Sequence, residues 1–279
     1  MLTGKNLLNE LVDELNELKL SHMAAKLDSL YHAPGFLEMD HMTLLAELIG
    51  DEYREKLSKT LLNRLRTAKL VGSPEELDKC IDSAEREYMP AGITSLLSSL
   101  DFIAKGYNVC ILGASDAGKS YLARALGIKA CNDYSVRYFH SEELLESMAA
   151  LKQQDYKKFA NRMKQLLNTE LIILDDFLLH TITEEKEVKI LFELLEQRNE
   201  QGRSTIVCSQ RDPDHWTAMI LNDEVSANSI LKRATKHYTI MIKAKDKSIV
   251  TMRPFCSVKR PLKNGIAAAD GRKMQMMES

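Results

Sequence analysis

The sequence lacks an excess of charge of either sign and lacks long apolar runs. Its 279 residues carry 38 Lys and Arg against 40 Asp and Glu, a formal net charge of −2. This balance excludes a uniformly basic protein but is compatible with a local basic face. No apolar run approaches the length of a membrane span, and the N-terminal residues lack the basic-then-apolar order of a secretion signal. We therefore expect a soluble, cytoplasmic protein with no membrane partner.

Cysteine is scarce, and no two cysteines are close in the sequence. Metal and redox sites typically use C-x-x-C pairs, which are absent here. Two of the cysteines, Cys110 and Cys208, lie inside apolar runs typical of strands. Buried, reduced thiols are the ordinary state of such residues in a cytosolic protein. We expect this state for the whole set, which is Cys80, Cys110, Cys131, Cys208 and Cys256.

The first 88 residues predict helices only. Apolar residues recur at helical spacing from residue 7 to residue 18, and Pro34-Gly35 then breaks the pattern. A second helical stretch extends from about residue 42 to residue 70. The end of this stretch is basic and contains no acid, which indicates either a solvated helix face or contacts to nucleic-acid phosphates. The basic residues are Lys56, Lys59, Arg64, Arg66 and Lys69.

The pattern changes after YMPAG at residues 88–92. Short apolar strands then alternate with amphipathic helices, which implies a parallel sheet covered on both faces. The strands are predicted at 108–112, 136–139, 171–175 and 204–208, and the helices at about 118–131, 141–150, 153–168, 184–200 and 226–236. The predicted organisation is an all-helical N-terminal domain (1–88), an α/β domain (89–252) and a basic, disordered tail (253–279).

The segment GASDAGKS matches the phosphate-loop pattern G-x-x-x-x-G-K-[ST] between a predicted strand and a predicted helix. The helix N-terminus favours an anion, Lys119 can reach the β- and γ-phosphates, and Ser120 can ligate Mg²⁺. Glycines allow the backbone N–H groups of the loop to surround phosphate oxygens. The loop residues are Gly113, Ala114, Ser115, Asp116, Ala117 and Gly118. The sequence therefore predicts a nucleotide site.

Asp116 is the unusual residue of this loop, because its carboxylate stands in a segment that would hold a polyanion. The loop grips phosphate with backbone N–H groups and Lys119, not with its variable side chains. We therefore expect the Asp116 side chain to point outward and to affect nucleotide affinity only modestly.

Polar residues follow two of the predicted strands. We expect Asp175 to hold Mg²⁺ directly or through water, and Asp176 to orient or deprotonate the attacking water. A phosphotransferase needs only one acid for its metal, so the second acid favours a hydrolase. Gln210 ends the next predicted strand, where it is either a phosphate sensor that holds the water or a polar residue in a surface turn.

Arg233 lies on a predicted helix beside Lys232 and Lys236. The cluster is either a basic helix face or the place of an arginine that acts on the nucleotide of a neighbouring subunit, as in ring-forming ATPases. Trp216, the only tryptophan, is expected to pack in the interior and not to stack on a base.

Together these motifs resemble the IstB-like helper ATPases of insertion-sequence transposition, relatives of the helicase loader DnaC within the AAA+ class. The resemblance extends from about residue 5 to about residue 250. The segments that carry it, in order, are ELKLSHMAAKLDSL, LLNRLRTAKL, ILGASDAGKSYLARALG, LIILDDF, LLEQR and STIVCSQ. It implies an AAA+ P-loop NTPase core behind an all-helical N-terminal domain.

The resemblance also implies a function. It is that of an ATP- and Mg²⁺-dependent homo-oligomer with shared ATP sites, which binds double-stranded DNA and assists a cognate transposase in selecting and remodelling target DNA. By position, Asp175 resembles the metal ligand and Asp176 the residue that acts on water. Gln210 resembles the sensor, and Arg233 resembles the arginine finger.

The chain departs from the family pattern in three places. The arginine-finger helix reads Ala227-Asn228 and Lys232-Arg233 where the family usually has Ala-Asp and Asp-Arg, and Val250 stands where a second, cis-acting arginine is usual. Three alternatives therefore remain beside the transposition helper: a DnaC-like replicative helicase loader, a small-molecule kinase, and a nucleotide switch that does not hydrolyse ATP.

Overall fold

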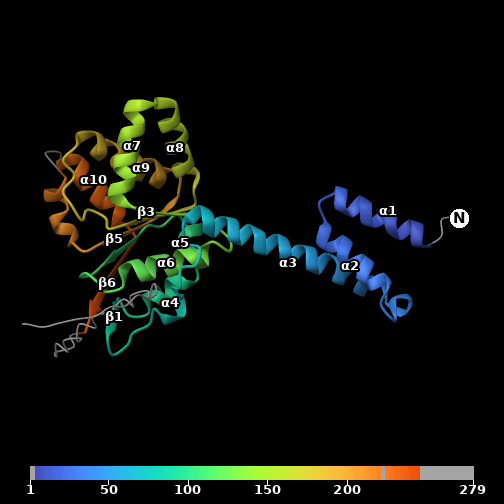
Figure 1. Cartoon of the computed structure of the whole chain (residues 1–279). Coiled ribbons are helices and arrows are strands. Elements are labelled where there is room, and N and C mark those ends of the chain that lie inside the picture. The colour runs from blue at the N-terminus through green and yellow to red at the C-terminus, as the bar shows by residue number, and fades with distance from the viewer. Residues whose placement is uncertain (1–3, 221–223, 246–279) are drawn as a thin grey trace, which may run out of the picture. The chain divides into compact units, whose positions relative to one another are not determined.

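A computed structural model describes residues 4–220 and 224–245 of the chain (Figure 1). Its first helices are α1 (Gly4–Glu17), α2 (Ser21–Tyr31) and α3 (His41–Ala68), which pack in sequence, α1 on α2 and α2 on α3. The predicted break at Pro34-Gly35 is confirmed, because Gly35 has a φ of +85° and precedes the 3-10 helix η1 (Phe36–Glu38). Asp40 caps α3 by accepting hydrogen bonds from two backbone N–H groups of its first turn.

The helical prediction is wrong for residues 69–88. The chain leaves α3 at Lys69, which has a left-handed φ of +60°, and continues through the 3-10 helix η2 (Leu77–Lys79) into strand β1 (Arg86–Met89). β1 has only four residues, and Tyr88 is its one buried residue, so no alternating pattern marks it as a strand. The domain boundary at residue 88 stays a prediction, and β1 straddles it.

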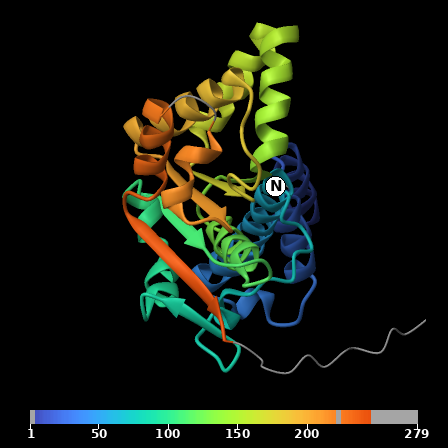
Figure 2. The same cartoon turned by 90° about the vertical axis from the view of Figure 1, so that its left-hand side faces the viewer.

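The strands form one six-stranded sheet in the order β1-β6-β2-β5-β4-β3 (Figure 2). All neighbours are parallel except β1, which pairs antiparallel with β6. The four predicted strands and the parallel sheet are confirmed, whereas β1 and β6 lie outside the predicted strands. The further strands are β2 (Val109–Leu112), β3 (Val136–His140), β4 (Leu171–Asp175), β5 (Ser204–Ser209) and β6 (Tyr238–Ala244).

Helices cover both faces of the sheet. Figure 1 shows α7, α9 and α10 on one face and α4 and α6 on the other. The helices of this part are α4 (Ile93–Ser98), α5 (Asp101–Ala104), α6 (Lys119–Ala130), α7 (Ser141–Gln154), α8 (Tyr156–Asn168), α9 (Glu185–Glu200) and α10 (Glu224–Ala234), with the 3-10 helices η3 (Pro213–His215) and η4 (Thr217–Met219). None of the described helices is both long and apolar enough to cross a membrane.

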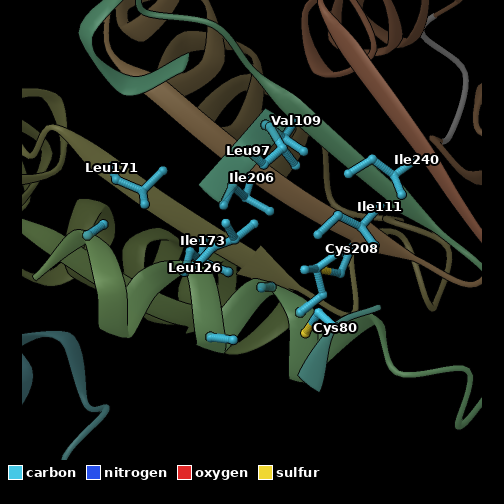
Figure 3. Close-up of a cluster of buried hydrophobic side chains, with 14 of the residues drawn as sticks. Cys80, Leu97, Val109, Ile111, Leu126, Leu171, Ile173, Ile206, Cys208 and Ile240 are labelled. Carbon is cyan, nitrogen blue, oxygen red and sulfur yellow. The ribbon is translucent and has the colours of Figure 1, made fainter. Parts of the chain in front are cut away.

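Each central strand sends alternate residues into one of two cores. Val109 and Ile111 join the core beneath α6, whereas Cys110 and Leu112 join the core beneath α7, α9 and α10. Figure 3 shows the first core, in which side chains of the sheet meet Leu126 of α6. The described cysteines are free and buried, as expected: Cys80, Cys110, Cys131 and Cys208. Cys256, Val250 and the predicted tail lie outside the described residues.

Trp216 is fully buried, with its ring centroid 5.0 Å from that of Phe177. Its indole N–H donates a hydrogen bond of 3.2 Å to the carbonyl of Arg211. A buried tryptophan with its N–H satisfied is a packing residue, so the prediction for Trp216 is confirmed.

Arg198, on α9, is buried without a carboxylate partner in the described chain and donates hydrogen bonds to the places where β4 and β5 begin. Burial lowers the pKa of Arg198 from its usual value. The planar guanidinium reaches five acceptors at once, which a lysine ammonium cannot do. The acceptors are the carbonyl oxygens of Leu166, Thr169, Glu170 and Ser204 and the hydroxyl of Thr205.

We expect Arg198→Lys to lower the free energy of unfolding by about 3 kcal/mol, because it leaves buried acceptors unpaired around a buried charge. Urea unfolding followed by circular dichroism measures the change. Arg54→Lys is the matched control, since the Arg54 side chain is 70% exposed, and its effect should stay within about 0.5 kcal/mol. Equal stability of the two variants would contradict the role given to Arg198.

Candidate nucleotide-binding site

The phosphate loop follows β2 and requires both of its glycines. A Cβ on Gly113 would lie 2.6 Å from the carbonyl oxygen of Ile242, so no side chain fits there. Gly118 has a φ of +104°, a conformation that other residues rarely adopt. Gly118 is also the N-cap of α6, and no side chain caps this helix. The first N–H groups of α6 are therefore left without a side-chain acceptor, as an anion site at a helix N-terminus requires.

Lys119 is buried at the start of α6, and its Nζ donates a hydrogen bond of 2.7 Å to the carbonyl of Ala114 in the loop. Burial lowers the pKa of Lys119, against the opposing effect of the carboxylates Asp175 and Asp176. The side chain is therefore folded back across the loop, with its ammonium at the place where a phosphate would be held.

One pocket of about 320 Å³ joins the predicted site residues from three parts of the chain. Asp176 comes from the end of β4, Gln210 from the end of β5, and the rest from the phosphate loop and the first turn of α6. The pocket is lined by Ser115, Asp116, Gly118, Lys119, Ser120, Tyr121, Asp176 and Gln210. These residues were predicted from separate motifs, except Tyr121, and the sheet brings them to one edge.

Asp175 lies beneath this pocket and is 1% exposed. Its carboxylate accepts a hydrogen bond from the hydroxyl of Tyr138 on β3, and another of 3.0 Å from the backbone N–H of Asp176. Burial, together with the bond to Asp175, raises the pKa of Tyr138 far above its usual value, so this hydroxyl stays a donor. The guanidinium of Arg124 lies over the Tyr138 ring at 5.0 Å and pairs with Glu75 at 3.1 Å.

Asp176 follows the last residue of β4 and has a left-handed φ of +52°. Its Oδ2 lies 3.3 Å from Nδ1 of His140, the last residue of β3. Neither Tyr138 nor His140 is among the predicted site residues. They reach the acids because β3 pairs with β4, which places His140 opposite Asp175. No local sequence motif predicts that pairing.

Arg233 is not part of this pocket. It forms an ion pair with Glu196 of α9, and its guanidinium lies 5.6 Å from the Phe192 ring. Its side chain is 19% exposed. Within one chain the structure therefore does not bring Arg233 to the phosphate loop, and its role as an arginine finger stays a prediction.

The five basic residues of α3 differ in their surroundings. Acids one turn earlier pair with two of them, Glu52 with Lys56 at 3.5 Å and Glu55 with Lys59 at 3.3 Å. The basic stretch predicted to contact DNA begins at Lys56, after these two acids, so the sequence pattern does not include them. DNA contact stays a prediction for all five residues.

Arg64 is engaged in a structural contact, because it donates hydrogen bonds to the carbonyls of Cys131 and Asn132 at the end of α6. Arg66 and Lys69 are exposed. Lys69 lines a second pocket, of about 450 Å³, together with Arg124 and Arg162.

The residues of the first pocket fit ATP with Mg²⁺. The loop N–H groups, the uncapped start of α6 and Lys119 supply donors for phosphate. Ser120 in the pocket and the buried Asp175 next to it carry oxygen atoms of the kind that Mg²⁺ prefers and would be its ligands. A phosphate loop after one parallel strand, with acids ending a second strand and a polar residue ending the strand between them, defines a P-loop nucleotide-binding core of the AAA+ class.

Comparison with known proteins supports this class and identifies the family. The fold is similar to the AMPPCP-bound DnaA from Aquifex aeolicus, with a TM-score of 0.50 and 18% identity over 62% of this chain and 51% of that one, about half its length. The family model described as IstB-like ATP binding protein matches residues 13–253. The chain belongs to this family.

Curated relatives agree with the assignment. The insertion sequence ATP-binding protein y4uH of Sinorhizobium fredii is 37% identical over 220 residues, which are 78% of this chain and 86% of the relative. The IS21 insertion sequence ATP-binding protein of Pseudomonas aeruginosa is 27% identical over 84% of this chain and 86% of the relative.

Asp116 is exposed, lines the pocket and has a left-handed φ of +59°. The outward orientation of its side chain stays a prediction. We predict that Asp116→Gly strengthens ATP binding by less than about tenfold, because solvent and salt screen the charge. Binding of a fluorescent ATP analogue measures this. Asp116→Asn removes the charge but keeps a side chain, and should account for most of the gain. A change of several hundredfold would show that the carboxylate faces the triphosphate.

Tyr138→Phe tests whether the Tyr138 hydroxyl positions Asp175. We expect the Mg²⁺ concentration needed for half-maximal ATP binding to rise about tenfold, because hydrogen bonds to a metal ligand fix its orientation. Nucleotide binding in EDTA should change little. Tyr156→Phe, at a side chain far from the pocket and exposed on α8, is the control. An unchanged Mg²⁺ requirement in Tyr138→Phe would rule out the positioning role.

Proposed function

We propose that the protein is an ATP-hydrolysing helper of a transposase, which acts on double-stranded DNA in the selection and remodelling of target DNA. The observation that carries this proposal is the single pocket in which the phosphate loop meets Asp176 and Gln210. Membership of the IstB-like ATP-binding family and the similarity to insertion-sequence proteins support the link to transposition.

In this proposal the chain's own residues divide the work of hydrolysis. The loop N–H groups and Lys119 hold the phosphates. Asp176 orients the attacking water and accepts its proton, with Gln210 holding the same water from the neighbouring strand. Mg²⁺, held by Ser120 and Asp175, would neutralise charge on the phosphates. Two acids at the end of β4, one buried and one open to the pocket, suit a hydrolase better than a kinase.

Arg233 acts, in this proposal, on the ATP of a neighbouring copy in a homo-oligomer with shared ATP sites. Its ion pair with Glu196 holds the guanidinium against its own α9. Assembly would then require Arg233 to exchange this carboxylate for a phosphate of the neighbour. Such an exchange makes assembly depend on bound ATP, because without the phosphate the arginine gains nothing by leaving Glu196.

Contact with duplex DNA is proposed for the basic end of α3. Arg66 and Lys69 are the strongest candidates of the five basic residues, because they are exposed and lack an acid within ion-pair distance in the described chain. Lys69 shares its pocket with Arg124, Arg162 and one acid, Glu143, and Arg124 is paired with Glu75, so Lys69 and Arg162 are the cations there for a phosphate backbone.

One experiment tests the function: ATP turnover and oligomer size with and without duplex DNA. We expect turnover to rise with DNA and oligomers to form with ATP. Lys119→Ala should abolish both effects, and Asp176→Asn should stop turnover while leaving ATP binding intact. Arg233→Ala should lower turnover about a thousandfold and weaken assembly.

Lys232→Ala, at the exposed neighbouring residue of α10, is the matched control for Arg233 and should behave like the unaltered protein. Turnover unaffected by duplex DNA, in a protein that stays monomeric with ATP, would refute the proposed function. Turnover stimulated by a replicative helicase, and not by DNA with a transposase, would favour the helicase-loader alternative.

A further inference from the structure

Arg86, on edge strand β1, lies against the phosphate loop although it is 32 positions before the loop's last glycine in the sequence. A Cβ placed on Gly118 would lie 3.4 Å from Cζ, 3.5 Å from Nε and 3.5 Å from Nη1 of Arg86. The Cβ position is almost equally far from three atoms of this planar group. The face of the guanidinium, and not its edge, is therefore turned toward Gly118. Arg86 therefore packs in van der Waals contact with the last glycine of the loop.

Arg86 interacts with the hydroxyl of Tyr88 two residues along β1 and lies near the thiol of Cys80, both neutral groups. On the side of the phosphate loop its neighbours are positive. Gly118 caps the N-terminus of α6, which carries partial positive charge, and Lys119 is the next residue. None of the ion pairs between described residues includes Arg86. A guanidinium beside a second cation and a helix N-terminus is unfavourable unless an anion joins them. The arrangement is therefore suited to a ligand that carries several negative charges.

The strand order fixes the side from which Arg86 approaches. β5 and β4, which end in Gln210 and Asp176, lie on one side of β2, whereas β6 and β1 lie on the other. The terminal phosphate belongs on the side of Asp176 and Gln210, where water is to be activated. Arg86 faces the loop from the opposite side, toward which the rest of the nucleotide must extend.

We propose that Arg86 binds the α- or β-phosphate of the nucleotide held by its own chain. This inference rests on the proposed function only in that the loop binds ATP. Val250 stands in the sequence where the family usually has a cis-acting arginine. Arg86, on β1, supplies a second cis-acting cation besides Lys119. Because it contacts phosphates common to ATP and ADP, it serves binding and not the hydrolytic step.

The test compares full-length Arg86→Ala, Arg86→Gln and Arg86→Lys with the unaltered protein. Fluorescent ATP and ADP analogues measure affinity, and steady-state turnover separates KM from kcat. We expect Arg86→Ala to weaken both nucleotides by about ten- to hundredfold, the factor expected for loss of a charge-assisted hydrogen bond. We expect kcat at saturating ATP to stay within about threefold, and Arg86→Lys to recover part of the affinity.

Glu87→Ala is the matched control, since the next residue of β1 is also half-buried and its side chain points to the other face of the strand. Thermal unfolding without nucleotide shows whether each variant is folded, and Arg86→Gln keeps the proposal testable if Arg86→Ala is not. Affinity unchanged within twofold, loss for ATP alone, or a fall in kcat at unchanged affinity would each overturn it. None of these readouts uses DNA or a transposase, so failure of the transposition role would leave the result intact.

Discussion

The nucleotide site lies at the carboxyl ends of the parallel strands and depends on a constraint at their amino ends. There, one buried guanidinium holds the beginnings of β4 and β5 together. Arg198 binds carbonyl oxygens just before β4 and at the first residue of β5. Parallel strands that are tied at their starts, Leu171 opposite Ser204, stay in register to their ends. Asp176 and Gln210 then emerge beside each other at the phosphate loop. The positions of Asp176 and Gln210 at the pocket are thus set about five residues away, at the starts of their strands.

The features that the sequence predicts correctly are those with local causes. The central strands are continuous apolar runs because the sheet is covered on both faces, and the phosphate loop is a contiguous motif between a strand and a helix. Asp176 and Gln210 follow such strands directly, so their meeting at one edge needed only the assumption of a parallel sheet. Burial of Trp216 follows from its size and its mainly apolar surface.

The features that the sequence does not predict depend on which strands are neighbours. Tyr138 and His140 reach the two acids only because β3 lies beside β4, and Arg86 reaches Gly118 only because β1 joins the sheet at its far edge. β1 itself is too short to show a period. The ion pairs of α3 are not predicted for a different reason: helical neighbours are one turn apart, so the acids that pair with Lys56 and Lys59 stand before the basic stretch.

Helix α6 joins the two halves of the chain mechanically. Its first residues belong to the phosphate loop, and the carbonyls of Cys131 and Asn132, directly after its last residue, accept hydrogen bonds from Arg64 of α3. Twelve helical residues form a stiff helix about 18 Å long. A displacement of one end of α6 therefore moves the other end as well. If a bound nucleotide shifts the start of α6, α3 shifts with it, and a displacement of α3 must then alter nucleotide affinity by the same coupling free energy. A change at either end of α6 is therefore transmitted through one continuous helix to the other end.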